Sequence, residues 1–192
     1  MAIAQIEYRL CNFYSAERGS IDALGIFEAL STPRHQAACE RMLSMVCVDL
    51  DELEGASEHA LQAERLFRSI AEPAGQVEAA ILLAQAHLLA KNASDARSAL
   101  AEARRIEIIE PEVKQHLLLT DAWLDMESLR FEDASQRLLS AFALFEEHQR
   151  VADHTAQLLA RLSRTPLSAK AHGVVVRWRK LIAERNRRTR ET

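Results

Sequence analysis

The sequence is poor in residues that form turns. Five glycines and four prolines in 192 residues are too few for the many short turns of an all-β chain. No apolar run approaches the length of a membrane-spanning helix, roughly 18 residues or more. The 48% hydrophobic and 27% charged residues, with a formal net charge of −4, are typical of an ordinary soluble globular protein. We therefore expect an all-α fold about one domain long.

Cysteine is also scarce. Cys11, Cys39 and Cys47 are too few and too irregularly spaced for a disulfide framework or a zinc site, and an odd number suits a reducing compartment. Glu7 and Arg9 interrupt the segment where a secretory signal needs an apolar core. These features predict a cytoplasmic protein.

Motifs that carry catalysis are missing as well. The five glycines are solitary, which excludes a glycine-rich phosphate loop, and no nucleophile elbow is present. The seven histidines are scattered without a His-Glu-x-x-His spacing, so we expect no metal site. The three cysteines fall at helical positions where small apolar residues are expected, which favours packing over a nucleophilic role. We predict a protein that is not an enzyme and that has no cofactor.

The prolines indicate an internal repeat. Pro33, Pro73 and Pro111 are separated by forty and then thirty-eight positions, and proline is preferred in the first turn of a helix. Small residues recur at fixed distances after each proline. Counted eleven, then twenty-three, then thirty positions on, they are Ser44, Ala84 and Ala122, then Ala56, Ala96 and Ala134, then Ala63, Ala103 and Ala141.

Each repeat contains two amphipathic stretches, for example 73–90 and 94–108, with apolar residues at spacings of three and four. We therefore predict antiparallel helix pairs stacked in series within a single domain, 1–192. The expected repeat units are about 4–32, 33–72, 73–110 and 111–150. They are followed by capping helices over 151–185, with a break near Pro166, and by a basic tail over 186–192.

The pattern resembles the tetratricopeptide repeat, in which a small residue in the first helix is followed by an alanine and further small or apolar residues in the second. The resemblance covers about residues 4–150, with Asp121 where the family has a leucine. The repeats exceed the family's usual length of about 34 residues, as in the long-repeat variant of bacterial transcriptional activators and signalling proteins. The matching residues are Leu10, Cys11, Tyr14, Ala23, Phe27 and Leu30; Leu43, Ser44, Ala56, Ala60 and Ala63; Leu83, Ala84, Ala96, Leu100 and Ala103; and Ala122, Ala134, Leu138 and Ala141.

The resemblance implies a right-handed superhelical solenoid whose first helices line a concave ligand surface. It implies a mostly apolar groove that binds a protein or peptide with an apolar segment, as in a scaffold, adaptor or sensory module. Self-association, an intramolecular contact and plain core packing remain alternatives for the same residues. The groove positions are Tyr8, Asn12, Arg41, Met45, Val48, Ile81, Gln85, Leu88, His116, Leu119, Trp123 and Met126.

The C-terminal stretch is basic. Residues 174–192 hold seven Lys or Arg and two acids, which leaves a nucleic-acid-associated regulatory protein as the alternative function. Trp178 is the one aromatic residue there, and the apolar residues around it form a stripe typical of a packed helix. A solvated capping helix is therefore the favoured interpretation, and nucleic acid is disfavoured as a partner.

Overall fold

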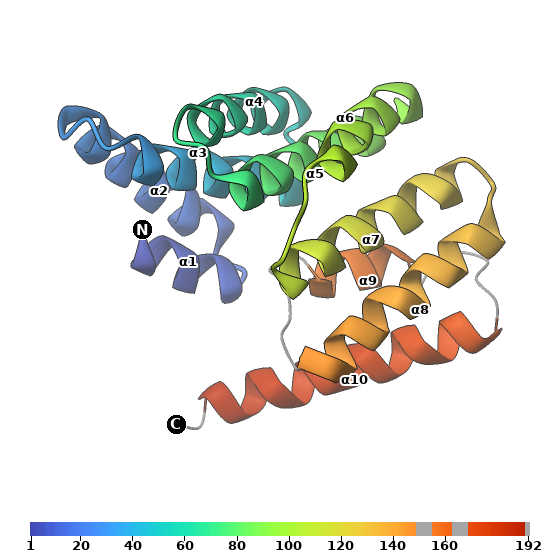
Figure 1. The fold of residues 1–192 in the computed structure, drawn as a ribbon. Coiled ribbons are helices and arrows are strands. Elements are labelled where there is room, and N and C mark those ends of the chain that lie inside the picture. The colour runs from blue at the N-terminus through green and yellow to red at the C-terminus, as the bar shows by residue number, and fades with distance from the viewer. Residues whose placement is uncertain (149–154, 163–168, 191–192) are drawn as a thin grey trace. The chain divides into compact units, whose positions relative to one another are not determined.

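The computed structural model describes residues 1–148, 155–162 and 169–190, which form ten helices and contain no strand (Figure 1). The all-α prediction is therefore confirmed. The chain forms two compact units, Met1–Ile108 and Ile109–Thr192. Their boundary falls within two residues of the predicted boundary between units 73–110 and 111–150. The expectation of one continuous domain over 1–192 stays a prediction.

The first unit consists of three helix pairs. From α2 to α6, each helix begins twenty residues after the one before it, so a pair repeats every forty residues. Helices α3 and α5 begin at Pro33 and Pro73, as predicted. Each helix packs on the next, and α3 also packs on α5, so successive pairs are stacked. The helices are α1 (Ala2–Arg9), α2 (Phe13–Ala29), α3 (Pro33–Asp49), α4 (Leu53–Ser69), α5 (Pro73–Leu89) and α6 (Ala93–Arg105).

The turns between these helices share one backbone shape. The backbone N–H of Glu72 donates to the carbonyl of Phe67 at 3.0 Å, which satisfies a carbonyl at the end of α4. The residue before Glu72, Ala71, has a φ of 53°. Glycine is usual in this left-handed region, yet this chain places other residue types there at every turn. They are Cys11, Ser31, Asp51, Ala71, Lys91 and, in the second unit, Leu129.

These turns correct the register expected for the first pair. The resemblance places Leu10 and Cys11 inside the first helix, but α1 ends at Arg9 and both are exposed in the turn that follows. Tyr14 belongs to α2. The equivalent of Ala56 is therefore Ala16, forty residues earlier. The expected alignment of Ala23 with Ala56 is wrong by seven residues.

Small residues build the core where the helices approach one another. The predicted alanine positions in α4 and α6 are completely buried, as are Ser44 and Ala84 in the first helices of their pairs. At Gly75 even a methyl group would overlap the ring of Phe67 on α4, so α5 must be without a side chain there. The fully buried alanines of the second helices are Ala16, Ala56, Ala60, Ala63, Ala96 and Ala103.

The second unit begins with one more pair, α7 (Pro111–Glu127) and α8 (Phe131–His148). Ala122, Ala134 and Ala141 are fully buried in it, as the repeat predicts. Helix α9 (Thr155–Leu162) packs on α7, and α10 (Ala169–Arg190) packs on α8 and α9. Helix α10 continues five residues into the expected basic tail, and the break predicted at Pro166 lies outside the described residues.

Helix α10 is anchored by the stripe that the sequence predicts. Val175 and Trp178 are fully buried and Ile182 nearly so. The Trp178 ring lies 5.4 Å from that of Phe142 and 5.3 Å from that of Phe145, both on α8. Aromatic pairs at such distances add to the burial of their apolar area. This packing agrees with a capping role for the helix.

We expect Ala71→Gly to stabilise the chain. An L-residue in the left-handed region costs roughly 1–2 kcal/mol of folded-state stability, which glycine would recover. Glycine also makes the unfolded chain more flexible, and this offsets about 0.4–1 kcal/mol of the gain. The free energy of unfolding, measured with urea, should rise by about 0.5–1 kcal/mol. The matched control is Ala101→Gly inside α6, which should lower it by a similar amount. A loss in both variants would contradict the turn assignment.

Ala103→Arg tests the helix contact. Ala103 is fully buried, so the larger side chain must push α6 from its neighbours and cost at least about 1–3 kcal/mol. Ala101→Arg, two residues away and partly exposed, is the control and should change stability by no more than about 0.5 kcal/mol. Equal melting midpoints for the two variants would show that Ala103 does not lie in a helix contact.

Candidate partner-binding surface

The expected groove residues of the first helix pair and of α3 divide into core and surface. Tyr8 and Met45 are 3% and 1% exposed and belong to one apolar cluster with Ala16 and Leu82. The Tyr8 hydroxyl donates to Asp49 Oδ2 at 2.5 Å, which links α1 to α3. These two side chains therefore hold the helices together.

Asn12 and Arg41 are the expected groove residues with polar contacts near the surface. Asn12 is exposed before α2, where its Nδ2 donates to Glu7 Oε2 at 2.8 Å. Arg41 is partly buried on α3, and its Nε lies 3.4 Å from Glu78 Oε2 on α5. Neither residue is apolar.

The remaining members in the first unit lie on α3 and α5 and are buried. Val48, Ile81 and Leu88 are at most 3% exposed, and the Gln85 side chain is fully buried. Side chains this buried offer little area to a partner. Their assignment to a partner-binding groove stays a prediction.

The last four groove residues all lie on α7, in the second unit. His116, Leu119, Trp123 and Met126 are at most 7% exposed. Trp123 Nε1 donates to Glu127 Oε1 at 3.3 Å. The twelve expected positions thus fall into eight residues of the first unit and four of the second, each set mostly buried. The apolar groove expected from the sequence is not an open surface within either set.

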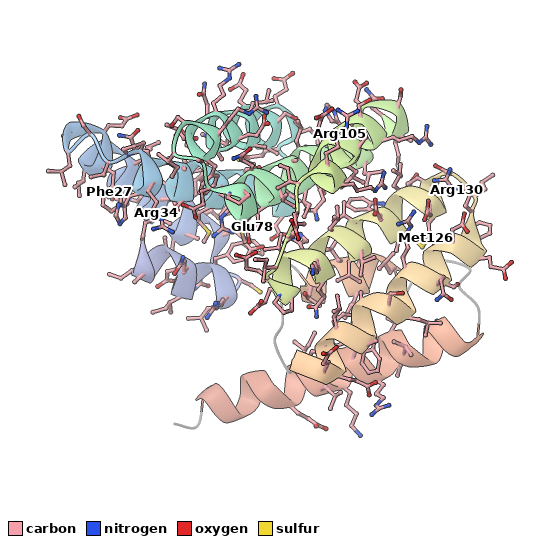
Figure 2. All side chains as sticks on the ribbon, in the orientation of Figure 1. Phe27, Arg34, Glu78, Arg105, Met126 and Arg130 are labelled. Atoms are coloured by element: carbon pink, nitrogen blue, oxygen red, sulfur yellow. The ribbon has the colours of Figure 1, made fainter. Side chains whose placement is uncertain are left out.

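A polar face that the sequence reasoning missed runs along α3 and α5. Arg34 Nε lies 3.0 Å from Glu72 Oε2, and the Arg41–Glu78 pair lies two helical turns further along α3. Arg34 and Glu78 carry labels on this unit in Figure 2. We name the four residues Arg34, Arg41, Glu72 and Glu78 the charged ladder. Its signal in the sequence is an acidic residue thirty-eight positions after Arg34 and thirty-seven positions after Arg41, two or three positions short of the repeat length.

A hollow of about 640 Å³ lies at one end of the ladder. Two turns line it, residues 31–35 before and within α3 and residues 70–73 before α5. These turns are forty residues apart, so the stacking of α3 on α5 brings them together. The ring of His35 stacks on that of Phe27 at 4.6 Å, which fixes one wall. The hollow is open and mixed in polarity, and Arg34 is its most exposed ion-pairing side chain, at 73%.

The second unit contains a buried charge cluster. Asp121 and Asp125 on α7 are 3% and 2% exposed. Arg137 on α8 contacts both, at 3.0 Å to Asp121 Oδ2 and 2.5 Å to Asp125 Oδ2. Arg130, in the turn between the two helices, donates to Asp125 Oδ1 at 3.1 Å from Nε, and Figure 2 labels it near Met126. Asp121 stands where the resembling family has leucine.

The positive charge of Arg137 is stabilised by its carboxylate partners. Burial alone would lower the pKa of Arg137, but the hydrogen bond to Asp125 and the charges of Asp121 and Asp125 outweigh burial and raise this pKa. The guanidinium of Arg137 connects α7 and α8 through these two carboxylates. Neither carboxylate is exposed to solvent, so neither is placed to act as a general base.

Two of the three thiols are packed, as expected. Burial raises the pKa of Cys39 to about 11, and burial together with the charge of Glu52 raises the pKa of Cys47 to about 12. Both thiols are therefore neutral at pH 7 and poor nucleophiles. Cys11 contradicts the packing interpretation because it lies exposed in the α1–α2 turn.

The described residues hold no group of three or more histidine, cysteine or acidic side chains placed to bind a metal ion. No helix among them has the length and apolar character to cross a membrane. Comparison with protein-family models and with curated proteins finds no match for the chain.

We expect Arg137→Leu to unfold the second unit more easily. Removing this partner takes away the guanidinium that Asp121 and Asp125 share inside the fold, which costs about 3 kcal/mol, near the low end for a buried pair because Arg130 still holds Asp125. The control is Arg105→Leu, whose exposed pair with Glu102 should change stability by no more than about 0.5 kcal/mol. The measurement is thermal unfolding followed by circular dichroism.

A third variant distinguishes the loss of ion pairing from the loss of side-chain packing as the cause of the destabilisation. Arg137→Leu combined with Asp121→Leu and Asp125→Leu replaces the buried ions by apolar groups and should recover most of the loss. If this triple variant is less stable than Arg137→Leu alone, the loss of the buried ion pairs does not explain the effect.

Proposed function

We propose that the chain is a non-catalytic interaction module that binds a protein or peptide along the first helices of its pairs. In this proposal it serves as a scaffold, an adaptor or the sensory part of a bacterial signalling or regulatory system. The pairs would wind into the right-handed superhelix that the resemblance to tetratricopeptide repeats implies.

The stacking of α3 on α5 supports this proposal most directly. Repeats that stack with a constant length present the same helix face again and again, which gives an extended contact surface without a catalytic cleft. The charged ladder occupies that face, and its ion pairs are partly exposed. A partner with alternating charge or hydrogen-bonding groups fits the ladder. The apolar segment predicted from the sequence would have to reach side chains that are now buried.

The nucleic-acid alternative depends on α10. Its described part exposes Arg177, Arg179 and Lys180. Arg177, however, already lies 3.0 Å from Glu146 and 5.5 Å above the ring of Phe142. These contacts favour a helix that covers α8, so this function ranks second.

Charge reversal at Arg34 tests the ladder. Exposed ion pairs contribute little to stability, so Arg34→Glu should leave the melting midpoint nearly unchanged. It should reduce the set of proteins retained from a cell lysate on the immobilised chain, quantified by mass spectrometry. Arg65→Glu, the same change on the exposed side of α4, should retain the wild-type set.

A charge swap completes the design. Arg34→Glu with Glu72→Arg rebuilds the internal pair in reverse and should still lose the partner, because the partner meets the opposite charge pattern. Restored retention in the swap would mean that the pair matters only within the chain. Identical retention by all variants would contradict the proposed surface.

A further inference from the structure

The two ion pairs of the charged ladder expose opposite charges. In the pair of Arg34 with Glu72, the arginine side chain is 73% exposed and the glutamate 29%. In the pair of Arg41 with Glu78 the order is reversed, with 15% for the arginine and 30% for the glutamate. The ladder therefore offers a positive group beside the hollow and a negative group two helical turns further along α3.

The guanidinium of Arg34 indicates which group binds at the hollow. Arginine has five N–H donors arranged in a planar fork. Among the described residues, Arg34 makes one contact, from its Nε to Glu72 Oε2 at 3.0 Å, so the donors of its two terminal nitrogens remain for a ligand. These two nitrogens match the two oxygens of a carboxylate. The adjoining hollow of about 640 Å³ has room for an acidic side chain.

Small side chains separate the two ion pairs. Helical spacing places Ala38 between Arg34 and Arg41 on one face of α3. On α5, Ala74 lies one turn before Glu78. Both alanines are partly exposed. Because the distance between packed helices depends on the side chains at their contact, alanine here lets a further helix approach closely.

The spacing of the two pairs favours a helical partner. Arg34 and Arg41 are seven residues apart, which is about 10.5 Å along α3. A partner helix places side chains seven residues apart on one face at the same distance. Side chains on one face of an extended strand lie about 6.6 or 13 Å apart, so they miss one of the two pairs. A polyanion such as nucleic acid would meet the carboxylate of Glu78 with like charge.

We propose that the partner binds the charged ladder as an α-helix that carries an acidic and a basic residue seven positions apart. The acidic residue enters the hollow and binds the terminal nitrogens of Arg34, and the basic residue pairs with Glu78. This assignment rests on the proposed function, to which it adds the secondary structure and the charge order of the partner.

The test is a selection of peptides on the immobilised full chain, from one display library of helical peptides and one of unstructured peptides. The wild type should retain helical peptides enriched in Asp or Glu at one position and in Lys or Arg seven positions away. On Arg34→Glu, a basic residue should replace the acidic one. On Glu78→Gln, only the basic residue should lose its enrichment. The matched control, Arg65→Glu on the exposed side of α4, should return the wild-type pattern.

A synthetic copy of the most enriched peptide gives the affinity by calorimetry. Its dissociation constant should be roughly tenfold higher for Arg34→Glu than for the wild type. Exchanging the acidic residue of the peptide for Lys should restore most of this loss. A variant that is merely misfolded would not be rescued by a charge change in the peptide.

Three outcomes would overturn the proposal. They are enrichment from the unstructured library alone, enrichment of helices without the paired charges, and no enrichment from either library. Retention of lysate proteins separates this inference from the proposed function. If that retention depends on Arg34 while no helical peptide is enriched, this inference is wrong and the proposed function stands. If retention is independent of Arg34 as well, both are wrong.

Discussion

The close approach of neighbouring helices is the constraint on which this structure depends. It requires a small residue wherever helices cross, as at Gly75, where the ring of Phe67 occupies the space of a side chain. Helices α2 to α5 are each 17 residues long, so the chain must reverse direction in three residues each time. A left-handed residue does this while satisfying the last carbonyls of the helix. Because Cys11, Ala71 and others stand there instead of glycine, stability is held below its attainable value.

The sequence predicts most of the helix pairs well, but it predicts the register of the first pair, α1 and α2, poorly. Both results have a physical cause. Ala56, Ala96 and Ala134 recur because each meets a neighbouring helix, so their spacing reports the repeat directly. Leu10 and Cys11 were expected inside a helix because the turn in which they lie contains no glycine or proline that would identify it in the sequence. In the sequence, the boundary after Ile108 is indicated only weakly, by a repeat that is two residues shorter than the one before it. Helix α6 is four residues shorter than each of α2 to α5, and an extended residue, Ile106, follows it.

The candidate surface was harder to predict than the fold because an apolar residue on a first helix has two possible surroundings. Met45 and Trp123 have the spacing of groove residues, but the same spacing serves a helix buried on several sides, and both are buried. The polar residues separate these cases better. Arg34 and Arg41 must keep their charged ends near water, so they mark the side of α3 that remains accessible.

Buried charge shows how the two units differ within one repeat pattern. In the first unit, the side chains buried between helices are mainly small or apolar, as at Ala16 and Met45. In the α7–α8 pair, Asp121 and Asp125 take positions on the buried side, and Arg137 must follow them. Such a cluster contributes little net stability compared with apolar packing, but it accepts one arrangement of the two helices and penalises others. A pair held in this way keeps one register between its two helices.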